Sequence, residues 1–578
     1  MMLLALYPQF RLWNKNGNER NSVYSYNDID EVAYTAYLQA LIDGRPRKND
    51  PYTGRDNHPK ESLFSIQFAT PYMIALPARL FGLSASTAMI ITSALSAFFS
   101  ALALFWLIKK ITNDEKLSAV GALIVLCLGT LAAGEGAIYE ITNRGIAYPF
   151  LPFLRRYVPA VPFPFFFAMC AFVWCALKNE REKTRYAFAF LAVVCFAFQV
   201  YSYFFLWTVA FAWLAGLFVL WILSRPENFR RDFELLLFTL AVSLLSLVPY
   251  AFMLANRSRA MDDVQLLTTT HKPDLLRLPE LISYAVIIVL LVALIRGTFA
   301  WKNKRMLFVL SFALVPFMAF NQQIITGYSL QPIHYQVFGG NYVALLSVIL
   351  CAALFKKEGE RIFSNSVLIL LALVALVWGV IEVKYSARVL DEHNLVRNEA
   401  VLVEKRLAEL AKENPKEALK HTTLNLDFIQ ADDQPTFAPQ PVLWSRHQHI
   451  FAGVTWEENK ERFYQLLYYA GLNEEWLAQT LYSGDSVTII ALFGWGRITN
   501  RLTANQQPLT QFEVDMEIRA FANYIATFDR ERAAKYQLHY VITRFDYANG
   551  FERLDHWYER DEGERIGKFI LYRVKLRE

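Results

Sequence analysis

The sequence predicts a mainly α-helical, polytopic membrane protein of about 11 transmembrane helices, followed by a C-terminal soluble α/β domain. Hydrophobic residues make up 54% of the 578 residues, which is too apolar for an ordinary soluble chain. Long apolar runs continue to about residue 384, and the charged residues are concentrated after that point. We therefore expect a transmembrane bundle over residues 1–384, with a first outer loop at 14–83, and a soluble domain over residues 385–578.

The predicted spans follow from run length, because a helix needs about 20 apolar residues to cross the hydrocarbon. Residues 187–223 are too long for one crossing, and the polar segment 199–203 predicts a tight hairpin within them. Residues 1–13 lack the basic start and the cleavage site of a signal peptide, and we interpret them as the outer part of a first, short span. The other candidates are residues 84–108, 117–134, 161–177, 187–203, 204–223, 235–254, 281–297, 306–320, 338–355 and 362–383.

The orientation is predicted from the basic residues, which are more frequent in cytoplasmic loops. Lys and Arg are concentrated in alternate loops, near residues 109–116, 178–185, 225–231, 296–305 and 356–361. These loops are predicted to be cytoplasmic, so the first outer loop, the loops near 135–160, 255–280 and 321–337, and the C-terminal domain face outward from the plasma (inner) membrane. A net charge of +5, carried mainly in loops, gives no basis for nucleic-acid binding.

The C-terminal domain is predicted to be α/β because short apolar runs alternate there with helical patterns. Strands are expected at 422–428, 487–493, 539–543 and 568–574, and helices at 457–470 and 512–527. The five cysteines all lie in apolar runs of the bundle, so no disulfide is expected in this domain. The chain has no cysteine or histidine spacing typical of a metal site, and no metal ligands are predicted.

The first outer loop carries an acidic segment, Asp28-Ile29-Asp30-Glu31. Apolar residues then recur with helical spacing, which predicts an amphipathic helix over 29–42 whose apolar face lies on the membrane interface. Asp28 and Glu31 fit a capping arrangement at the start of this helix, which is the structural alternative to a catalytic role. Asp30 has no evident capping role, so it is the preferred candidate for a base.

A first span, an outer loop in which Asp30-Glu31-Val32-Ala33-Tyr34 opens a helix, a bundle and an outer C-terminal domain together resemble the GT-C superfamily of membrane glycosyltransferases. Protein O-mannosyltransferases and aminoarabinose transferases are examples. The resemblance implies transfer of a sugar, with inversion, from a polyprenyl-phosphate donor to a lipid, glycan or protein acceptor on the periplasmic face. It implies a catalytic group of Asp30, Glu31 and Asp28. No Trp-Trp-Asp motif occurs in the C-terminal domain, which disfavours the oligosaccharyltransferase branch.

Such a donor needs cations for its phosphate, and arginine binds phosphate bidentately without titrating. The outer loops supply the candidates Arg144, Arg155, Arg156, Arg257, Arg259 and His334. Asp262 and Asp263 can neutralise Arg257 and Arg259, so the loop with Arg144, Arg155 and Arg156 is favoured. The alternative for these arginines is anchoring to lipid headgroups at the membrane edge.

Neutral polar residues suited to a sugar are densest in the segment 321–335, which includes Gln331, His334 and Tyr335. Gln331, Tyr335 and Glu140 are the predicted donor or sugar-binding residues, although His334 is equally suited to capping the next helix. Glu140 could also approach Asp30 as a second acid, which leaves a divalent cation as an open alternative. No other cofactor is predicted.

Two other classes of function remain as alternatives. A polysaccharide polymerase or ligase of the O-antigen type also acts on lipid-linked sugars, but usually through Arg and His in one large loop between late spans. A non-enzymatic transport or assembly subunit would carry charges inside its spans or paired broken helices. The predicted span interiors are nearly free of charge.

Overall fold

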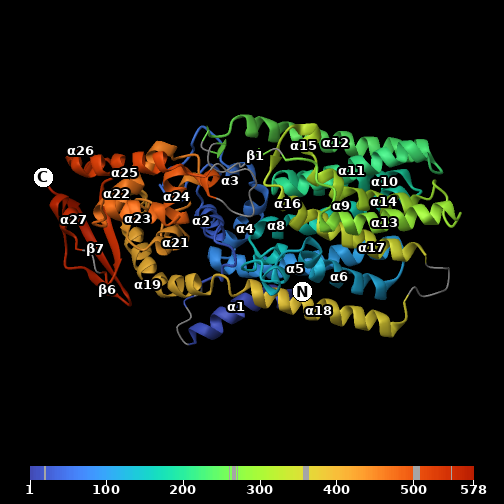
Figure 1. The fold of residues 1–578 in the computed structure, drawn as a ribbon, viewed down its shortest axis with the longest axis horizontal. Helices are drawn as coiled ribbons and strands as arrows, with labels where there is room; N and C mark the ends of the chain where they lie inside the picture. The colour runs from blue at the N-terminus through green and yellow to red at the C-terminus, as the bar shows by residue number, and fades with distance from the viewer. Residues whose placement is uncertain are drawn as a thin grey trace.

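The computed structural model describes residues 1–578 except 18–20, 22, 260, 263–267, 270, 356–362, 499–507 and 548–549. Long helices form a bundle at one end of an elongated molecule, and a smaller mixed domain forms the other end (Figure 1). The predicted class, a polytopic helical bundle followed by an α/β domain, is confirmed.

Nine helical stretches within the described residues are long and apolar enough to cross a membrane, so the chain is a multi-pass membrane protein. The two further spans in the predicted set of about 11 correspond to α1 (Met2–Asn16) and α14 (Lys304–Phe320), which are shorter, with 15 and 17 residues. Seven of the nine stretches are single helices: α5 (Ala85–Thr112), α6 (Glu115–Ala133), α10 (Glu182–Val200), α11 (Phe204–Ser224), α12 (Phe229–Ala255), α13 (Leu278–Ile295) and α18 (Asn365–Ser386). The stretch Tyr157–Lys178 consists of α8 (Tyr157–Ala160) and α9 (Pro162–Lys178). The stretch Ile333–Leu354 consists of α16 (Ile333–Tyr335), η3 (Gln336–Gly340) and α17 (Asn341–Leu354).

Apolar side chains lie on the outside of this bundle, as a lipid-facing surface requires. Leu245 and Phe252 of α12 and Ile295 of α13 are among the exposed ones. The predicted hairpin within 187–223 is confirmed, since α10 ends at Val200 and α11 begins at Phe204. At one end of the bundle the buried carboxylate of Asp232 accepts from Arg185 Nη2 at 3.0 Å and Lys304 Nζ at 2.7 Å, which joins α10, α12 and α14.

The predicted first outer loop, residues 14–83, forms α2 (Glu31–Ile42), α3 (Leu63–Ile66) and α4 (Ala69–Leu80). The prediction that the first of these helices lies on the membrane interface is wrong, because every residue of α2 except Gln39 is buried. Helix α2 packs between α4 and α5 on one side and α21 (Phe428–Phe437) of the C-terminal domain on the other. Helix α4 is too short to span, and its exposed residues Met73, Leu76 and Leu80 suit an interfacial position.

Short elements complete other loops of the bundle. They are α7 (Ala137–Ile141), η1 (Pro152–Leu154), α15 (Gln323–Thr326) and a two-stranded antiparallel pair of β1 (Thr268–Thr269) and β2 (Ser329–Leu330). The pair joins the loop after α12 to the loop after α14.

The C-terminal domain contains a five-stranded sheet in the order β3-β4-β7-β5, with β6 also paired to β7. Strands β3 and β4 are parallel, and the other pairs are antiparallel. The strands are β3 (Thr422–Asn425), β4 (Leu538–Arg544), β5 (Tyr558–Arg560), β6 (Glu564–Ile566) and β7 (Phe569–Leu576). Three of the four predicted strands are thus confirmed. The fourth, 487–493, is instead α24 (Ser486–Phe493), because Asp485 caps it by accepting from Thr488 N–H at 2.8 Å.

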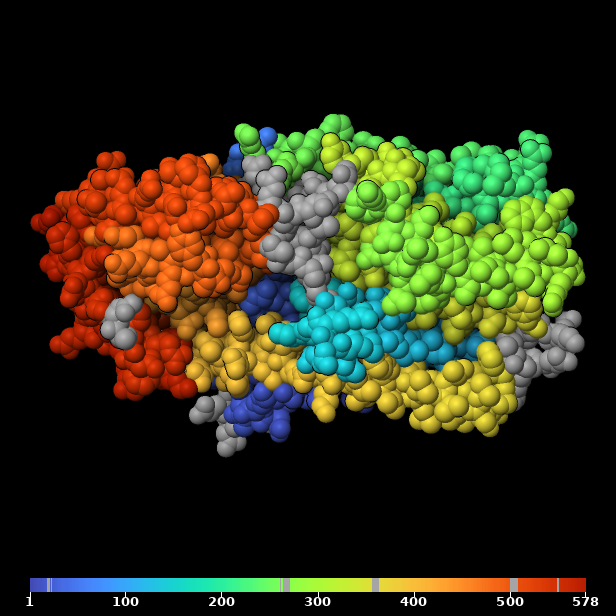
Figure 2. Space-filling view, in the orientation of Figure 1, coloured from blue at the N-terminus to red at the C-terminus, as the bar shows by residue number. Residues whose placement is uncertain are grey.

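The other helices of this domain surround the sheet and pack against the first outer loop. They are α19 (Asp391–Glu413), α20 (Pro415–Ala418), η4 (Gln448–Ile450), α22 (Trp456–Tyr469), α23 (Glu474–Tyr482), η5 (Trp495–Arg497), α25 (Gln511–Ala526), α26 (Arg530–Lys535) and α27 (Glu552–Trp557). In Figure 2 a small blue part of the first outer loop is visible at the junction of the C-terminal domain and the bundle, beside the cyan segment of the bundle and the gold start of the C-terminal domain.

The predicted orientation can be tested with single cysteines in a cysteine-free background. Ser364 begins α18, Ser483 follows α23, and both are exposed. An impermeant maleimide should label Ser483→Cys in intact cells and label Ser364→Cys only after permeabilisation, because the C-terminal domain is expected outside. The reverse pattern would overturn the outward assignment of this domain and of the acidic loop together.

Candidate active site

The acidic segment before α2 is held by hydrogen bonds from its own backbone. The carboxylate of Glu31 accepts from the backbone N–H of Asn27 at 2.8 Å and of Asp28 at 2.9 Å. Asp28 Oδ1 accepts from the backbone N–H of Asp30 at 3.1 Å. Glu31 is fully buried and these bonds fix the turn before α2, which fits the capping role that the sequence offered as the alternative. Asp30 stands at the N-cap position but makes no capping bond, and about a third of its side chain is exposed.

Two consecutive arginines from the 135–160 loop meet the two aspartates. Arg155 Nε lies 2.5 Å from Asp28 Oδ2, and Arg156 Nη1 donates to Asp30 Oδ2 at 2.7 Å. Tyr148 of the same loop donates its hydroxyl to Asp28 Oδ2 at 3.1 Å. The structure therefore brings Asp28, Asp30, Arg155 and Arg156 together, although they are far apart in the sequence.

Both arginines are buried among aromatic rings. The Arg155 side chain is 3% exposed and its guanidinium lies 5.0 Å from the ring centre of Tyr148 and 5.2 Å from that of Phe338. Arg156 lies over Tyr34 at 4.7 Å. Among the described residues, Arg155 Nη1 has no hydrogen-bond partner. A buried guanidinium in this state can stabilise a further anion strongly, because water does not screen it.

His334 lies near Phe338, the ring that Arg155 also approaches, and Tyr335 follows it in the chain. The His334 ring is 5.6 Å from Phe338 and 4.5 Å from Phe205, and Tyr335 is 5.2 Å from Phe205. Both residues are buried, and among the described residues His334 Nδ1 and the Tyr335 hydroxyl have no partner. Gln331 forms the turn before them, with φ at 35° and its carbonyl accepting from His334 N–H at 3.0 Å. The alternative that His334 caps the next helix is not supported, because within residues 333–354 no side-chain capping hydrogen bond is present.

The remaining candidates lie elsewhere. Glu140 pairs with Arg388 and accepts from the backbone N–H of Ala147 at 3.1 Å, so it is not the partner of Asp30. Arg144 and Arg259 are exposed. Arg257 pairs with Asp262 at 2.6 Å, as the sequence indicated, and Asp263 falls outside the described residues.

A metal is not favoured by these contacts. Each aspartate already has an arginine against its carboxylate, and such cations compete with a metal ion for the same oxygens. Within the described ranges, no group of three or more His, Cys, Asp or Glu side chains is arranged to hold one.

The C-terminal domain adds residues that the sequence analysis missed. His447 Nε2 lies 3.7 Å from Asp30 Oδ1, and its Nδ1 lies 2.9 Å from Asp432 Oδ2. Arg446 Nε donates to the same Asp432 oxygen at 2.8 Å. The signal that could have found them is the run Arg446-His447-Gln448-His449, which is unusually rich in titratable residues for a buried segment.

Positive and negative side chains alternate around Asp30 and His447, and each stabilises the charge of its neighbours. Burial would raise the pKa of Asp30, but His447, Arg156 and Arg155 outweigh it and hold that pKa well below its usual range. Burial would lower the pKa of His447, but Asp432 and Asp30 raise it to about 9. At neutral pH Asp30 is therefore a carboxylate between the cations Arg156 and His447.

A buried network of hydrogen bonds fixes the residues that lead to the acidic segment. Arg397 of α19 donates to Asp433 at 2.7 Å and lies 3.4 Å from the ring centre of Tyr26. The Tyr26 hydroxyl donates to Asp433 at 3.0 Å, and Asn394 accepts from the Tyr26 backbone N–H at 3.0 Å. The C-terminal domain thus positions residues just before Asp28.

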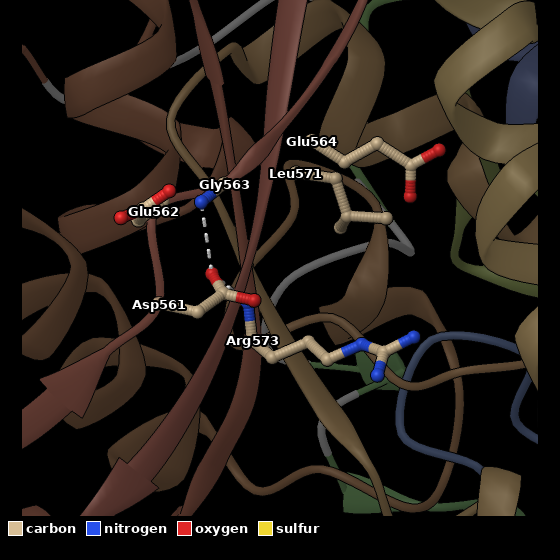
Figure 3. A pocket seen from close by; sticks show the side chains of 6 residues that line it. All are labelled: Asp561, Glu562, Gly563, Glu564, Leu571 and Arg573. Atoms are coloured by element: carbon tan, nitrogen blue, oxygen red, sulfur yellow. Dashed lines mark hydrogen bonds between the residues drawn. The ribbon is translucent and has the colours of Figure 1, made fainter.

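A pocket of about 380 Å³ lies at the other end of the C-terminal domain, beside β6 and β7 (Figure 3). Its polar groups bind one another: Asp561 Oδ1 accepts from the backbone N–H of Gly563 and of Arg573, and Glu564 pairs with Arg406 outside it. It is remote from the aspartates and arginines above and contributes no residue to them.

Comparison with known proteins finds no matching family model and no matching curated protein. Among solved structures, the chain is similar to ArnT from Cupriavidus metallidurans bound to undecaprenyl phosphate, with 11% identity over 99% of this chain and 97% of that chain and a TM-score of 0.40. It is similar to the Archaeoglobus fulgidus oligosaccharyltransferase in complex with zinc and sulfate, with 11% identity over 96% and 71% of the two chains and a TM-score of 0.48. It is similar to the mycobacterial arabinofuranosyltransferase AftD, with 12% identity, a TM-score of 0.46, and coverage of 100% of this chain but 40% of that one.

Proposed function

We propose that this chain is a membrane glycosyltransferase of the GT-C type, which transfers a sugar from a polyprenyl-phosphate donor to an acceptor at the outer face of the plasma membrane. The observation that carries the proposal is the convergence of a partly exposed carboxylate, Asp30, with the buried arginines Arg155 and Arg156 at one end of an apolar bundle. A lipid-linked phosphate sugar presents its reactive carbon at this height, while its prenyl chain stays in the hydrocarbon.

Arg155 is proposed to bind the donor phosphate. Its buried Nη1 has no hydrogen-bond partner among the described residues, it cannot lose its charge near neutral pH, and its aromatic surroundings exclude water. As the bond between the sugar and the phosphate breaks, negative charge accumulates on the leaving phosphate, and a fixed cation in a dry site stabilises it. Arg156 is proposed to orient Asp30 through its 2.7 Å hydrogen bond.

Asp30 is proposed to accept the proton of the acceptor hydroxyl. The acceptor oxygen attacks the anomeric carbon, the carbon–phosphate oxygen bond breaks, and the hydroxyl proton passes to the Asp30 carboxylate. A carboxylate with a low pKa suits a late proton transfer, because the acceptor oxygen becomes strongly acidic only once it has bonded to carbon. A direct displacement of this kind inverts the anomeric centre.

Neutral groups next to the arginines are proposed to bind the sugar. The hydroxyls of Tyr203 and Tyr335 and Nδ1 of His334 are buried and have no partner among the described residues. The rings of these three residues pack against Phe205, and their centres lie within 5.4 Å of the Phe205 ring centre. Neutral donors beside an aromatic ring suit the hydroxyls and the apolar face of a sugar. The polymerase or ligase alternative would draw its arginines from a late loop, whereas these come from an early one.

The proposal predicts turnover of a lipid-linked sugar. The purified chain in nanodiscs should consume at least one member of a panel of polyprenyl-monophosphate sugars with a radiolabelled sugar, and the label should appear in an added lipid, glycan or protein fraction. The Asp30→Asn variant is the negative control. No consumption of any donor, together with no binding of undecaprenyl phosphate, would reject the proposal.

A further inference from the structure

We propose that His447 of the C-terminal domain is a positioning residue of the active site, which keeps Asp30 ionised and oriented for the acceptor. This inference rests on the proposed function, because it assigns how Asp30 is prepared for its role. It makes the C-terminal domain part of the active site.

The geometry divides the two oxygens of Asp30 between two parts of the chain. Oδ2 accepts from Arg156 Nη1 at 2.7 Å, and Oδ1 faces His447 Nε2 at 3.7 Å. The first cation comes from an outer loop of the bundle and the second from the C-terminal domain. A carboxylate held from both sides has one preferred orientation. A catalytic group needs such a fixed orientation to react with an incoming acceptor.

Asp432 fixes the imidazole in turn. Its Oδ2 lies 2.9 Å from His447 Nδ1, and its Oδ1 accepts from the His447 backbone N–H at 3.1 Å. Arg446 holds the same carboxylate at 2.7 Å. Asp432 belongs to α21, and α21 packs against α2, the helix that begins directly after Asp30. The two helices therefore set the distance between the imidazole and the Asp30 carboxylate.

The charges that face His447 favour its cationic form. Asp432 from α21 and Asp30 from the start of α2 oppose the single cation Arg446 on its own segment. His449, also on that segment, is buried near Trp456, and burial lowers its pKa to about 3, so it adds no charge. Arg156 contacts the other oxygen of Asp30. With its pKa raised to about 9, His447 faces Asp30 as an imidazolium at neutral pH.

The distance between His447 and Asp30 leaves Oδ1 able to accept a proton from the acceptor. A separation of 3.7 Å exceeds a hydrogen bond, so Oδ1 can still accept from an incoming acceptor hydroxyl. The acceptor proton passes to Oδ1 as the new glycosidic bond forms and the electron pair of the old one leaves with the phosphate. Protonated Asp30 between two cations is strongly acidic, so it returns the proton to water and the site is restored. His447 itself neither gains nor loses a proton in this sequence.

The first test follows the histidine itself. In the full-length chain in nanodiscs with ¹⁵N-labelled histidine, one imidazolium signal should persist to about pH 9. It should be absent from His447→Gln and present in the matched control His449→Gln. Asp432→Asn should lower the pKa of His447 by at least one unit, because the carboxylate that raises this pKa most is removed. A wild-type His447 that titrates near 6.5 would overturn the inference, whatever the variants do.

The second test is the pH profile of donor turnover, measured with a polyprenyl-phosphate sugar carrying a radiolabel. Wild-type turnover should fall as the pH rises through about 9, since His447 then loses its charge. His447→Gln should be slower at pH 7 by about tenfold to a hundredfold and should lack that alkaline decrease. If His447→Gln keeps the wild-type profile while Asp30→Asn is inactive, the role of His447 is rejected and the proposed function stands. If Asp30→Asn is fully active, the proposed function itself fails.

Discussion

Replacing Asp30 with Asn should lower the turnover of a polyprenyl-phosphate sugar by at least about a hundredfold, the usual worth of general acid–base catalysis. The substitution keeps the size of the side chain and removes its basicity. Asp30 makes no capping bond to α2, but it pairs with the buried Arg156, so the melting temperature should also fall, and turnover is compared only for folded protein. The measurement is initial-rate transfer by purified protein in nanodiscs, compared with its melting temperature.

Helix α2 supplies a matched control for this variant. Asp43 is its C-cap residue, and its exposed carboxylate accepts from Gln39. Asp43→Asn should therefore keep wild-type turnover. If Asp30→Asn works within about twofold of wild type and Asp28→Asn is inactive although folded, the base is Asp28 and Asp30 only begins the helix.

Replacing Arg155 with Gln should abolish measurable binding of undecaprenyl phosphate, because the buried guanidinium is the proposed phosphate ligand. The change also leaves the buried carboxylate of Asp28 unpaired, which destabilises by about 3–5 kcal/mol in comparable buried pairs. The double variant Arg155→Gln with Asp28→Asn removes both charges and separates the two effects. It should recover stability without recovering lipid binding.

Arg156 and Arg144 divide the roles further. Arg156→Gln should lower turnover more than lipid affinity, because Arg156 contacts Asp30 and its Nε is engaged by the carbonyl of Val158. Arg144→Gln should change neither quantity, since Arg144 is exposed. The losses should not vary with pH near neutrality, because arginine does not titrate there. If Arg155→Gln, Arg156→Gln and His334→Ala all stay within about twofold of wild type, the phosphate site is elsewhere.

The features that the sequence predicted well are local ones. Apolar run length predicted the spans and the hairpin before Phe204, since crossing a membrane depends on about 20 consecutive residues. Charged residues beside such runs are conspicuous, which is why Asp30, Arg155 and Arg156 could be selected. The neutralisation of Arg257 by Asp262 could be anticipated because the two are only five residues apart in the sequence.

The features that it missed depend on contacts across the chain. Helix α2 has the pattern of an interfacial helix, but α21 of the C-terminal domain covers it. Residues 487–493 read as a strand because all of them except Thr488 are apolar, yet the cap at Asp485 starts a helix. Arg144 is in the same loop as Arg155 but points to solvent, and His447 meets Asp30 only through the packing of α21 on α2.

The central claim is that Asp30, Arg155 and Arg156 form the site for a polyprenyl-phosphate donor. The most direct measurement is a cryo-electron microscopy structure of the chain in nanodiscs with undecaprenyl phosphate. We predict density for the phosphate within hydrogen-bond distance of Arg155, beside Asp30, with the prenyl chain continuing along the apolar surface of the bundle. A phosphate bound instead at the Arg257–Asp262 pair, at Arg144 or at another outer loop would contradict the claim.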